Sequence, residues 1–96
     1  MIFTSVKNTV VERLQKLYGD VYSQDNVMLS GTHTHAGPAG YAFYALYNMM
    51  SLGFQEKNFE TIVNGIVQAI VQAHTNLSDG GKIYVNVGEL LDSNVK

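Results

Sequence analysis

The sequence has no cysteine and one proline, and charged side chains make up 15% of its 96 residues. The absence of cysteine excludes disulfides and thiolate chemistry, although it does not fix the compartment. A net charge of −2 leaves no basic excess to neutralise phosphates, so we do not expect a nucleic-acid partner. No apolar run approaches the roughly 20 residues that span a bilayer. Residues 1–7 also lack the basic and apolar parts of a signal peptide, which a longer parent could carry upstream.

The residues that are present indicate an ordered chain of limited size. Apolar side chains make up 46% of it, which is unlike the composition of a disordered tail. A chain this short buries a smaller share of its surface than a larger domain does, so its stability alone would be limited. The length therefore fits one small domain or one segment of a larger domain.

Helical spacing predicts an amphipathic helix near the start of the chain, from Ser5 to about Tyr18. Thr4 or Ser5 is the expected N-cap, and Gly19 is the expected left-handed residue at its end. Its apolar stripe has spacings of four, four and three, through Val6, Val10, Leu14 and Leu17.

Two further helices are predicted. The clearer one runs from Asn58, the expected N-cap, to about Asn76. Its apolar side consists of Phe59, Ile62, Val63, Ile66, Ile70 and Ala73. The other, Tyr41 to about Leu52, is rich in aromatic residues and methionine and stops at Gly53.

Two short apolar runs predict strands. Val27–Ser30 follows a turn at Asp25-Asn26, and Ile83–Val87 follows a turn at Asp79-Gly80-Gly81. Mostly helical chain separates the two runs, which suggests a crossover connection in a parallel or mixed sheet. The predicted fold class is therefore α/β, with two short strands joined by a helical crossover and preceded by an amphipathic helix. Both strands need further partners to make a stable sheet.

Polar residues that could carry chemistry gather in one loop, residues 31–38, directly after the first predicted strand. In an extended backbone side chains two apart point the same way, so His33 and His35 should project together from the end of that strand. Ligands commonly bind at this end of strands in open α/β sheets, and neutral imidazole is a common zinc ligand. One interpretation is a metal site that uses at least one of them. Spacing alone supports this less than a chance occurrence, because tetrahedral zinc needs four ligands and His-x-His also arises by chance in polar loops.

Other candidates have simpler explanations. His74 lies near the end of the long predicted helix, where a favourable charge–dipole contact explains it. The Tyr41–Met50 stretch could line an acyl-chain groove, but aromatic and methionine side chains at helical spacing more often form core. Glu89 and Asp92 could form an acid/base pair, but without a partner they are better explained as solvated carboxylates. No serine lies in a G-x-S-x-G setting.

The stretch from Tyr18 to Tyr41 resembles the signature of the neutral (non-lysosomal) ceramidases. Its centre reads Gly-Thr-His-Thr-His-Ala-Gly-Pro, which is far more specific than His-x-His alone. Further matches follow in the same order at residues 46–48, 51–54 and 85–92, so the resemblance covers essentially the whole chain after its first few residues.

This resemblance implies a zinc-dependent amidohydrolase that cleaves ceramide into sphingosine and a fatty acid. It implies that His33 is a zinc ligand and that His35 binds and polarises the substrate amide. Zn²⁺ would bind and activate the attacking water and polarise the carbonyl. In the family the zinc is held by two histidines, a glutamate and a tyrosine. The resemblance places the remaining ligands, and a serine also implicated in the chemistry, beyond Lys96.

Two residues depart from the family pattern, which commonly reads T-H-T-H-S-G-P-G-G. Ala36 replaces a serine and so lacks a hydroxyl beside the site, while Ala39 stands where glycine is usual. A residue with a Cβ is readily tolerated at position 39 only if its φ is negative.

The leading interpretation is that residues 1–96 are one segment of a ceramidase catalytic domain and are inactive alone. The expected partners are the remainder of the full-length enzyme and ceramide, with the membrane surface reached through the lipid substrate. By resemblance, the parent enzyme would be extracellular or lie in the secretory pathway or at the plasma membrane. The alternative is a small, self-contained metal- or lipid-binding module without catalysis.

Overall fold

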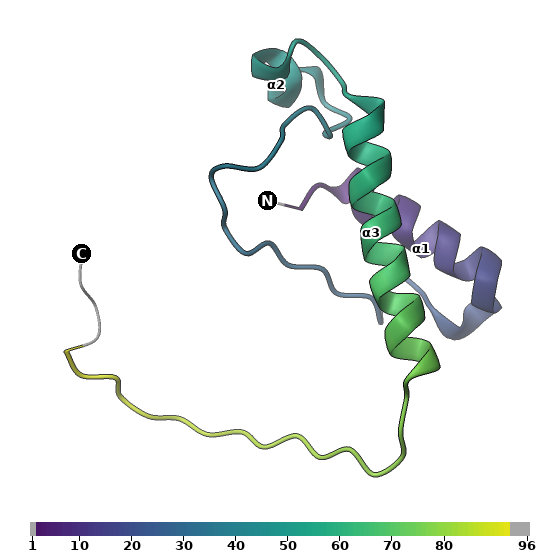
Figure 1. The fold of residues 1–96 in the computed structure, drawn as a ribbon, viewed down its shortest axis with the longest axis vertical. Helices are drawn as coiled ribbons and strands as arrows, with labels where there is room; N and C mark the ends of the chain where they lie inside the picture. Colours follow the sequence, from purple (N-terminus) through teal and green to yellow (C-terminus); the bar gives the residue numbers. More distant parts are fainter. Residues whose placement is uncertain (1, 93–96) are drawn as a thin grey trace.

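Two long helices form the framework of the molecule. α1 spans Thr4–Tyr18 and α3 spans Glu56–Thr75, and Figure 1 shows them crossing each other. The computed structural model describes residues 2–92. Met1 and residues 93–96, which belong to the predicted 1–96 segment, lie outside the described residues.

A long connection with little regular structure joins the two helices, and a further segment without a helix follows α3. A short 3₁₀ turn, η1 (Gly19–Val21), ends the first helix, and the chain then forms an open loop before α2 (Ala45–Asn48) and the 3₁₀ turn η2 (Met49–Ser51). After α3 the chain runs away from the helices, as Figure 1 shows. The radius of gyration is 17.1 Å, whereas a compact domain of about 100 residues has about 13 Å. Much of the chain is therefore not packed onto the helical framework.

The core lies between α1 and α3 and follows the predicted apolar stripes. Its fully buried side chains are Leu14, Val6, Val10 and Val63, with Phe59 at 5% exposure. Half-buried isoleucines of α3 pack around them. Leu17 is the exception, because it is 59% exposed although the spacing placed it on the buried stripe.

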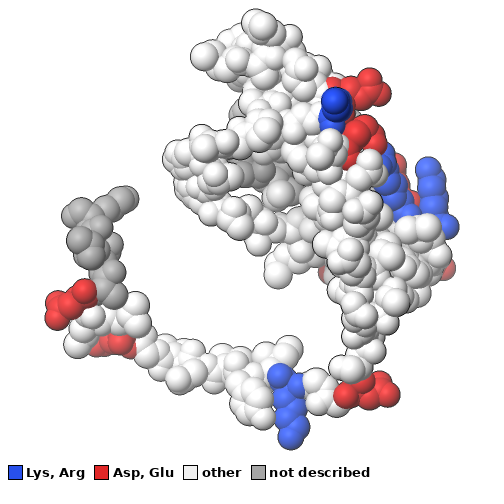
Figure 2. All heavy atoms as spheres, viewed as in Figure 1, with Lys and Arg blue, Asp and Glu red and all other residues white. Residues whose placement is uncertain are grey.

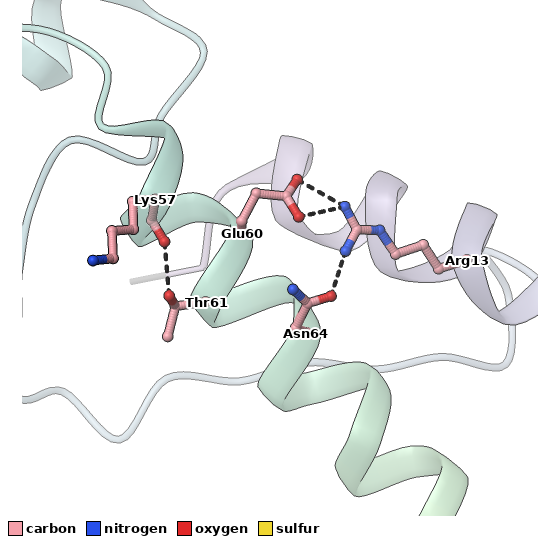
Figure 3. Close-up of polar contacts among 5 residues, drawn as sticks. All are labelled: Arg13, Lys57, Glu60, Thr61 and Asn64. Carbon is pink, nitrogen blue, oxygen red and sulfur yellow. Dashed lines mark hydrogen bonds and ion pairs between the residues drawn. The ribbon is translucent and has the colours of Figure 1, made fainter.

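A polar clamp joins the two helices beside this core (Figure 3). One guanidinium nitrogen of Arg13 donates to both carboxylate oxygens of Glu60, at 2.7 and 2.8 Å, and the other donates to the Oδ1 of Asn64. The Arg13 and Glu60 side chains are 29% and 41% exposed, so water screens part of their attraction. The clamp therefore fixes the register of α1 on α3 and contributes modestly to stability.

The far end of α3 is held by aromatic contacts. His74 lies in the last turn of the helix, as predicted, and the centroid of its ring lies 4.2 Å from the ring centroid of Tyr18. The hydroxyl of Tyr22 lies 2.9 Å from Nδ1 of His74. His74 thus has a packing role that the charge–dipole explanation did not include.

The predicted α/β class is wrong, because residues 2–92 contain no β-strand. Val27 is buried under the helices, and its N–H donates to the Ser23 carbonyl in a turn. Ile83–Val87 lies exposed, with Tyr84 at 86% and Ile83 at 94%. A strand exists only when a neighbouring segment pairs with its backbone, and Figure 1 shows the two apolar runs lying apart. The described fold is helical.

The predicted helix from Tyr41 to Leu52 is also largely wrong. Only Ala45–Asn48 is α-helical, and the turn that follows ends at Leu52, which adopts a left-handed φ of 59°. The side chain of Asn48 bonds to the backbone of Ala42, and such side-chain bonds compete with helix formation.

The ends of the long helices differ slightly from the prediction. Phe3 is the N-cap of α1 and Gln55 the N-cap of α3, and neither makes a side-chain capping bond. Gly19 ends α1 at the predicted position with a positive φ of 61°, but its ψ of −135° differs from the left-handed helical conformation that was expected. Within the described part of the chain, no helix has the length and apolar character needed to cross a membrane.

Candidate functional site

The loop that carries the two candidate histidines leaves the helical framework at Val27 and returns to it at Gly40. Both ends are buried, whereas residues 30–39 are exposed. Leu29 packs against the core next to the first end. The histidines therefore lie on a solvent-facing loop whose first end is fixed in the core and whose return end lies against the start of α3.

The structure brings His33 and His35 together, but not by the extended geometry that the sequence suggested. His33 has a φ of 65°, in the left-handed region. The two rings stack with centroids 4.8 Å apart and an angle of 15° between their planes. Residues with side chains adopt a left-handed φ uncommonly, and such conformations cluster at functional sites.

A hollow of about 610 Å³ lies beside these rings and is lined by Gly31, His33, Thr34 and His35. Both imidazoles are exposed to it, and nitrogen donors of this kind suit zinc. The described residues nevertheless contain no group of three or more His, Cys, Asp or Glu side chains that could hold a metal ion. The donors present therefore fit part of a zinc site, and a closed site needs donors from elsewhere.

The residues beside the histidines have local roles. The hydroxyl of Thr34 accepts a bond from the N–H of Ala36 at 3.4 Å, which closes a small turn within the loop. Ala39 is not among the residues of positive φ, so it meets the condition set by its Cβ.

The return end of the loop is held by bonds that sequence reasoning missed. The side chain of Asn58 donates to the carbonyl of Ala39 at 2.8 Å, and the N–H of Gln55 donates to the carbonyl of Gly40 at 2.6 Å. Gly40 has a φ of 84°, and a Cβ there would lie 3.0 Å from the carbonyl oxygen of Gly53. A glycine is therefore required where the loop runs against the turn that precedes α3.

Asn48 is the other residue that was missed. It is 4% exposed, its Oδ1 accepts from the N–H of Ala42 at 3.2 Å, and its Nδ2 donates to the Ala42 carbonyl. An asparagine within a run of aromatic residues and methionine was the available signal, because a buried amide needs specific partners.

Most of the aromatic and Met-rich stretch is not core in this chain, contrary to the prediction, although Ala42 is fully buried and Tyr41 packs against the core. Met50 is 95% exposed and Leu52 is 96% exposed. A cavity of about 540 Å³ lies in this region, lined by Ala42, Phe43, Ala45, Asn48, Met49, Leu52, Gly53 and Phe54. The whole stretch from Asn26 to Gln55 has no Asp, Glu, Lys or Arg. Figure 2 accordingly shows charged atoms gathered along one flank of the helices, opposite an uncharged face.

The candidate carboxylates do not join the histidines. Glu89 and Asp92 are exposed on the stretch that follows α3, which Figure 1 shows running away from the helical framework. Their exposure agrees with the solvated role expected from the sequence.

The comparisons with known proteins identify the family. The family described as "neutral/alkaline non-lysosomal ceramidase, N-terminal" matches residues 1–96. The chain belongs to this ceramidase family. Neutral ceramidase B of Dictyostelium discoideum is 55% identical over 96 residues, which are 99% of this chain and 13% of that protein. Neutral ceramidase of Pseudomonas aeruginosa is 48% identical over 94 residues, which are 98% of this chain and 14% of that protein.

The structural comparison agrees with this family. The crystal structure of neutral ceramidase from Pseudomonas aeruginosa matches with a TM-score of 0.76 and 52% identity, over 78% of this chain and 12% of that chain. The chain thus spans about one eighth of the ceramidases that it matches.

Proposed function

We propose that this chain is a segment of a ceramidase catalytic domain, and that the full-length enzyme hydrolyses the N-acyl amide of ceramide to sphingosine and a fatty acid. The family match over residues 1–96 is the observation that carries the proposal. The exposed Thr-His-Thr-His loop beside an open hollow supports it, because a lipid amide needs access to the reacting groups.

His33 and His35 have different roles in this proposal. His33 contributes a ring nitrogen to zinc, and His35 donates a hydrogen bond to the carbonyl oxygen of the amide as it gains negative charge. Bound zinc supplies Lewis acidity and an activated water at neutral pH. Hydrolysis forms a bond between the water oxygen and the carbonyl carbon, breaks the C–N bond, and passes a proton to the departing amine of sphingosine.

The site is completed by the remainder of the full-length enzyme. Two imidazoles cannot close a tetrahedral zinc site, and the described residues supply no third donor beside them. The uncharged, exposed face around Met50 and Leu52 fits the same proposal, because large apolar patches mark contact surfaces. The isolated chain is therefore inactive. The parent enzyme reaches ceramide at a membrane surface and is extracellular or lies in the secretory pathway or at the plasma membrane.

A chimera tests the proposal directly. Residues 2–92 replace the matching segment of the Pseudomonas aeruginosa neutral ceramidase, and ceramide hydrolysis and bound zinc are measured. We expect hydrolysis by the chimera, none by the isolated chain with added zinc, and loss of both hydrolysis and zinc in His33→Ala. The matched control is His74→Ala, which removes an imidazole outside the loop and should retain zinc. A folded chimera without hydrolysis, or turnover by the isolated chain that His33→Ala abolishes, contradicts the proposal.

The second candidate is a self-contained lipid-binding module. The cavity of about 540 Å³ beside Phe43, Met49 and Phe54 is the observation that favours it, because an apolar chain could enter there. This candidate requires a cooperative thermal transition of the isolated chain that shifts upward with a fatty acid. A non-cooperative transition with no such shift supports the segment instead.

A further inference from the structure

We propose that Asn48 is a positioning residue, which sets where the His33–His35 loop returns to the helical framework. The inference rests on the proposed function of the two histidines. Asn48 touches neither of them. It acts through the backbone of Ala42 and the turn before α3.

α2 is held in place by a polar contact of Asn48. Asn48 is the only buried residue of α2, while its neighbours Leu46, Tyr47 and Met49 are 71%, 58% and 64% exposed. This short element is therefore organised around a polar contact and not around apolar packing. Because the amide of Asn48 bonds both the N–H and the C=O of Ala42, it holds that residue at a fixed distance and orientation.

Asn48 also binds the turn before α3. Its backbone carbonyl accepts from the N–H of Gly53 at 2.9 Å and from the hydroxyl of Ser51 at 2.9 Å. The same turn receives Gly40, whose carbonyl accepts from the N–H of Gln55. The side chain of Asn48 thus binds Ala42, two residues after the return end of the loop, and its backbone carbonyl binds the turn against which Gly40 lies.

The position of the histidines depends on the two ends of their loop. Val27 fixes the first end of the loop in the core, and Asn58 holds Ala39 only four residues after His35. Residues 30–39 between these ends are exposed, so their placement depends on the two ends. A shift at Ala42 and Gly40 therefore moves the return end of the loop and with it His35. Misplacement of a reacting group by about 1 Å can cost about 100-fold in rate.

The test uses the chimera with Asn48→Ala and Asn48→Asp. Asp keeps the acceptor for the N–H of Ala42 but places a buried carboxylate oxygen against the Ala42 carbonyl, which repels it. We expect Asn48→Ala to lower kcat about 10- to 100-fold and to weaken zinc retention against a chelator, with an effect at least as large from Asn48→Asp. Arg13→Met is the matched control, because it loosens the α1–α3 clamp without touching the loop. It should lower the melting temperature and leave kcat and zinc retention within about twofold.

Equal kcat and zinc retention in folded Asn48→Ala and Arg13→Met overturns the positioning role. An inactive but folded parent chimera contradicts the proposed function instead, and a second measurement then tests Asn48 alone. In the 1–96 chain, proton NMR contacts between the rings of His33 and His35 and slow exchange of the Gln55 amide report the loop geometry. Asn48→Ala should remove both signals, and their persistence overturns the inference.

Discussion

Arg13 in α1 donates two hydrogen bonds to the carboxylate of Glu60 in α3, across 47 positions of sequence. This pair is the only salt bridge found among residues 2–92. It lies beside the apolar core between the two helices. The pair therefore selects one alignment of the helices among the several that apolar stripes would permit.

Arg13→Met should lower the free energy of unfolding by about 0.5–1.5 kcal/mol, because the pair is partly exposed and the methionine stem keeps the packing. Lys82→Met is the matched control: it removes the same charge from an exposed position after α3, and should change stability by no more than about 0.5 kcal/mol. Urea unfolding followed by helical circular dichroism measures both. Equal effects of the two substitutions would show that the clamp contributes nothing, and a loss that is unchanged in high salt would show that it is not electrostatic.

Leu14→Ala should destabilise the chain by about 2–5 kcal/mol, because Leu14 is fully buried between the helices and its loss leaves a cavity. For a chain this small, such a loss would abolish most of the helical signal. The same substitution at Leu17 provides the control, since Leu17 is 59% exposed. It should cost no more than about 0.5 kcal/mol. Similar losses at the two positions would place both leucines on the buried stripe, as the spacing alone predicted.

The two long helices could be predicted because helix formation and amphipathic spacing are local properties. The core consists of the predicted stripe through Val6, Val10 and Leu14, and Gly19, with a positive φ, ends α1 where it was expected. The absence of strands at the two apolar runs within residues 2–92 could not be predicted, because pairing depends on a neighbouring segment that local sequence does not specify.

The predicted helix over Tyr41–Leu52 failed for a different reason, since one asparagine redirects the backbone. Asn48 binds Ala42 and so holds residues 41–44 out of the helix. The loop of His33 and His35 was identified from the sequence, but the stacked geometry was not. That geometry depends on a left-handed φ that no pattern of residue types requires at His33.

Gly40→Ala should open the junction between the histidine loop and α3. The new Cβ would lie 2.6 Å from Cγ of Gln55 and 3.0 Å from the Gly53 carbonyl oxygen, in addition to the strain of a positive φ. Gly53→Ala is the control for strain alone, because its φ is 110° and its Cβ would meet open space. Hydrogen exchange of the Gln55 amide, which donates to Gly40, reports the junction.

We expect exchange of that amide to accelerate far more in Gly40→Ala than in Gly53→Ala, whose strain costs about 1–2 kcal/mol. Similar acceleration in both variants would mean that backbone strain, and not the close approach of the loop, controls the junction.

Met50→Ser should be nearly neutral for the stability of the isolated chain and destabilising in the ceramidase chimera. In the isolated chain Met50 is 95% exposed, so the substitution should change stability by no more than about 0.5 kcal/mol and should reduce binding of a hydrophobic dye. If the remainder of the enzyme covers the uncharged face, the same side chain is buried in the chimera, where its loss should cost about 2–5 kcal/mol. The control is Gln68→Ser on the exposed side of α3, which should be nearly neutral in both settings.

Thermal and urea unfolding are measured for Met50→Ser and Gln68→Ser, each in the isolated chain and in the chimera, and compared with the parent proteins. A cost at Met50 that appears only in the chimera identifies the uncharged face as a contact with the rest of the enzyme. A neutral result in both settings would leave that face exposed in the assembled protein, and its apolar side chains would then have to serve the lipid substrate or the membrane surface directly.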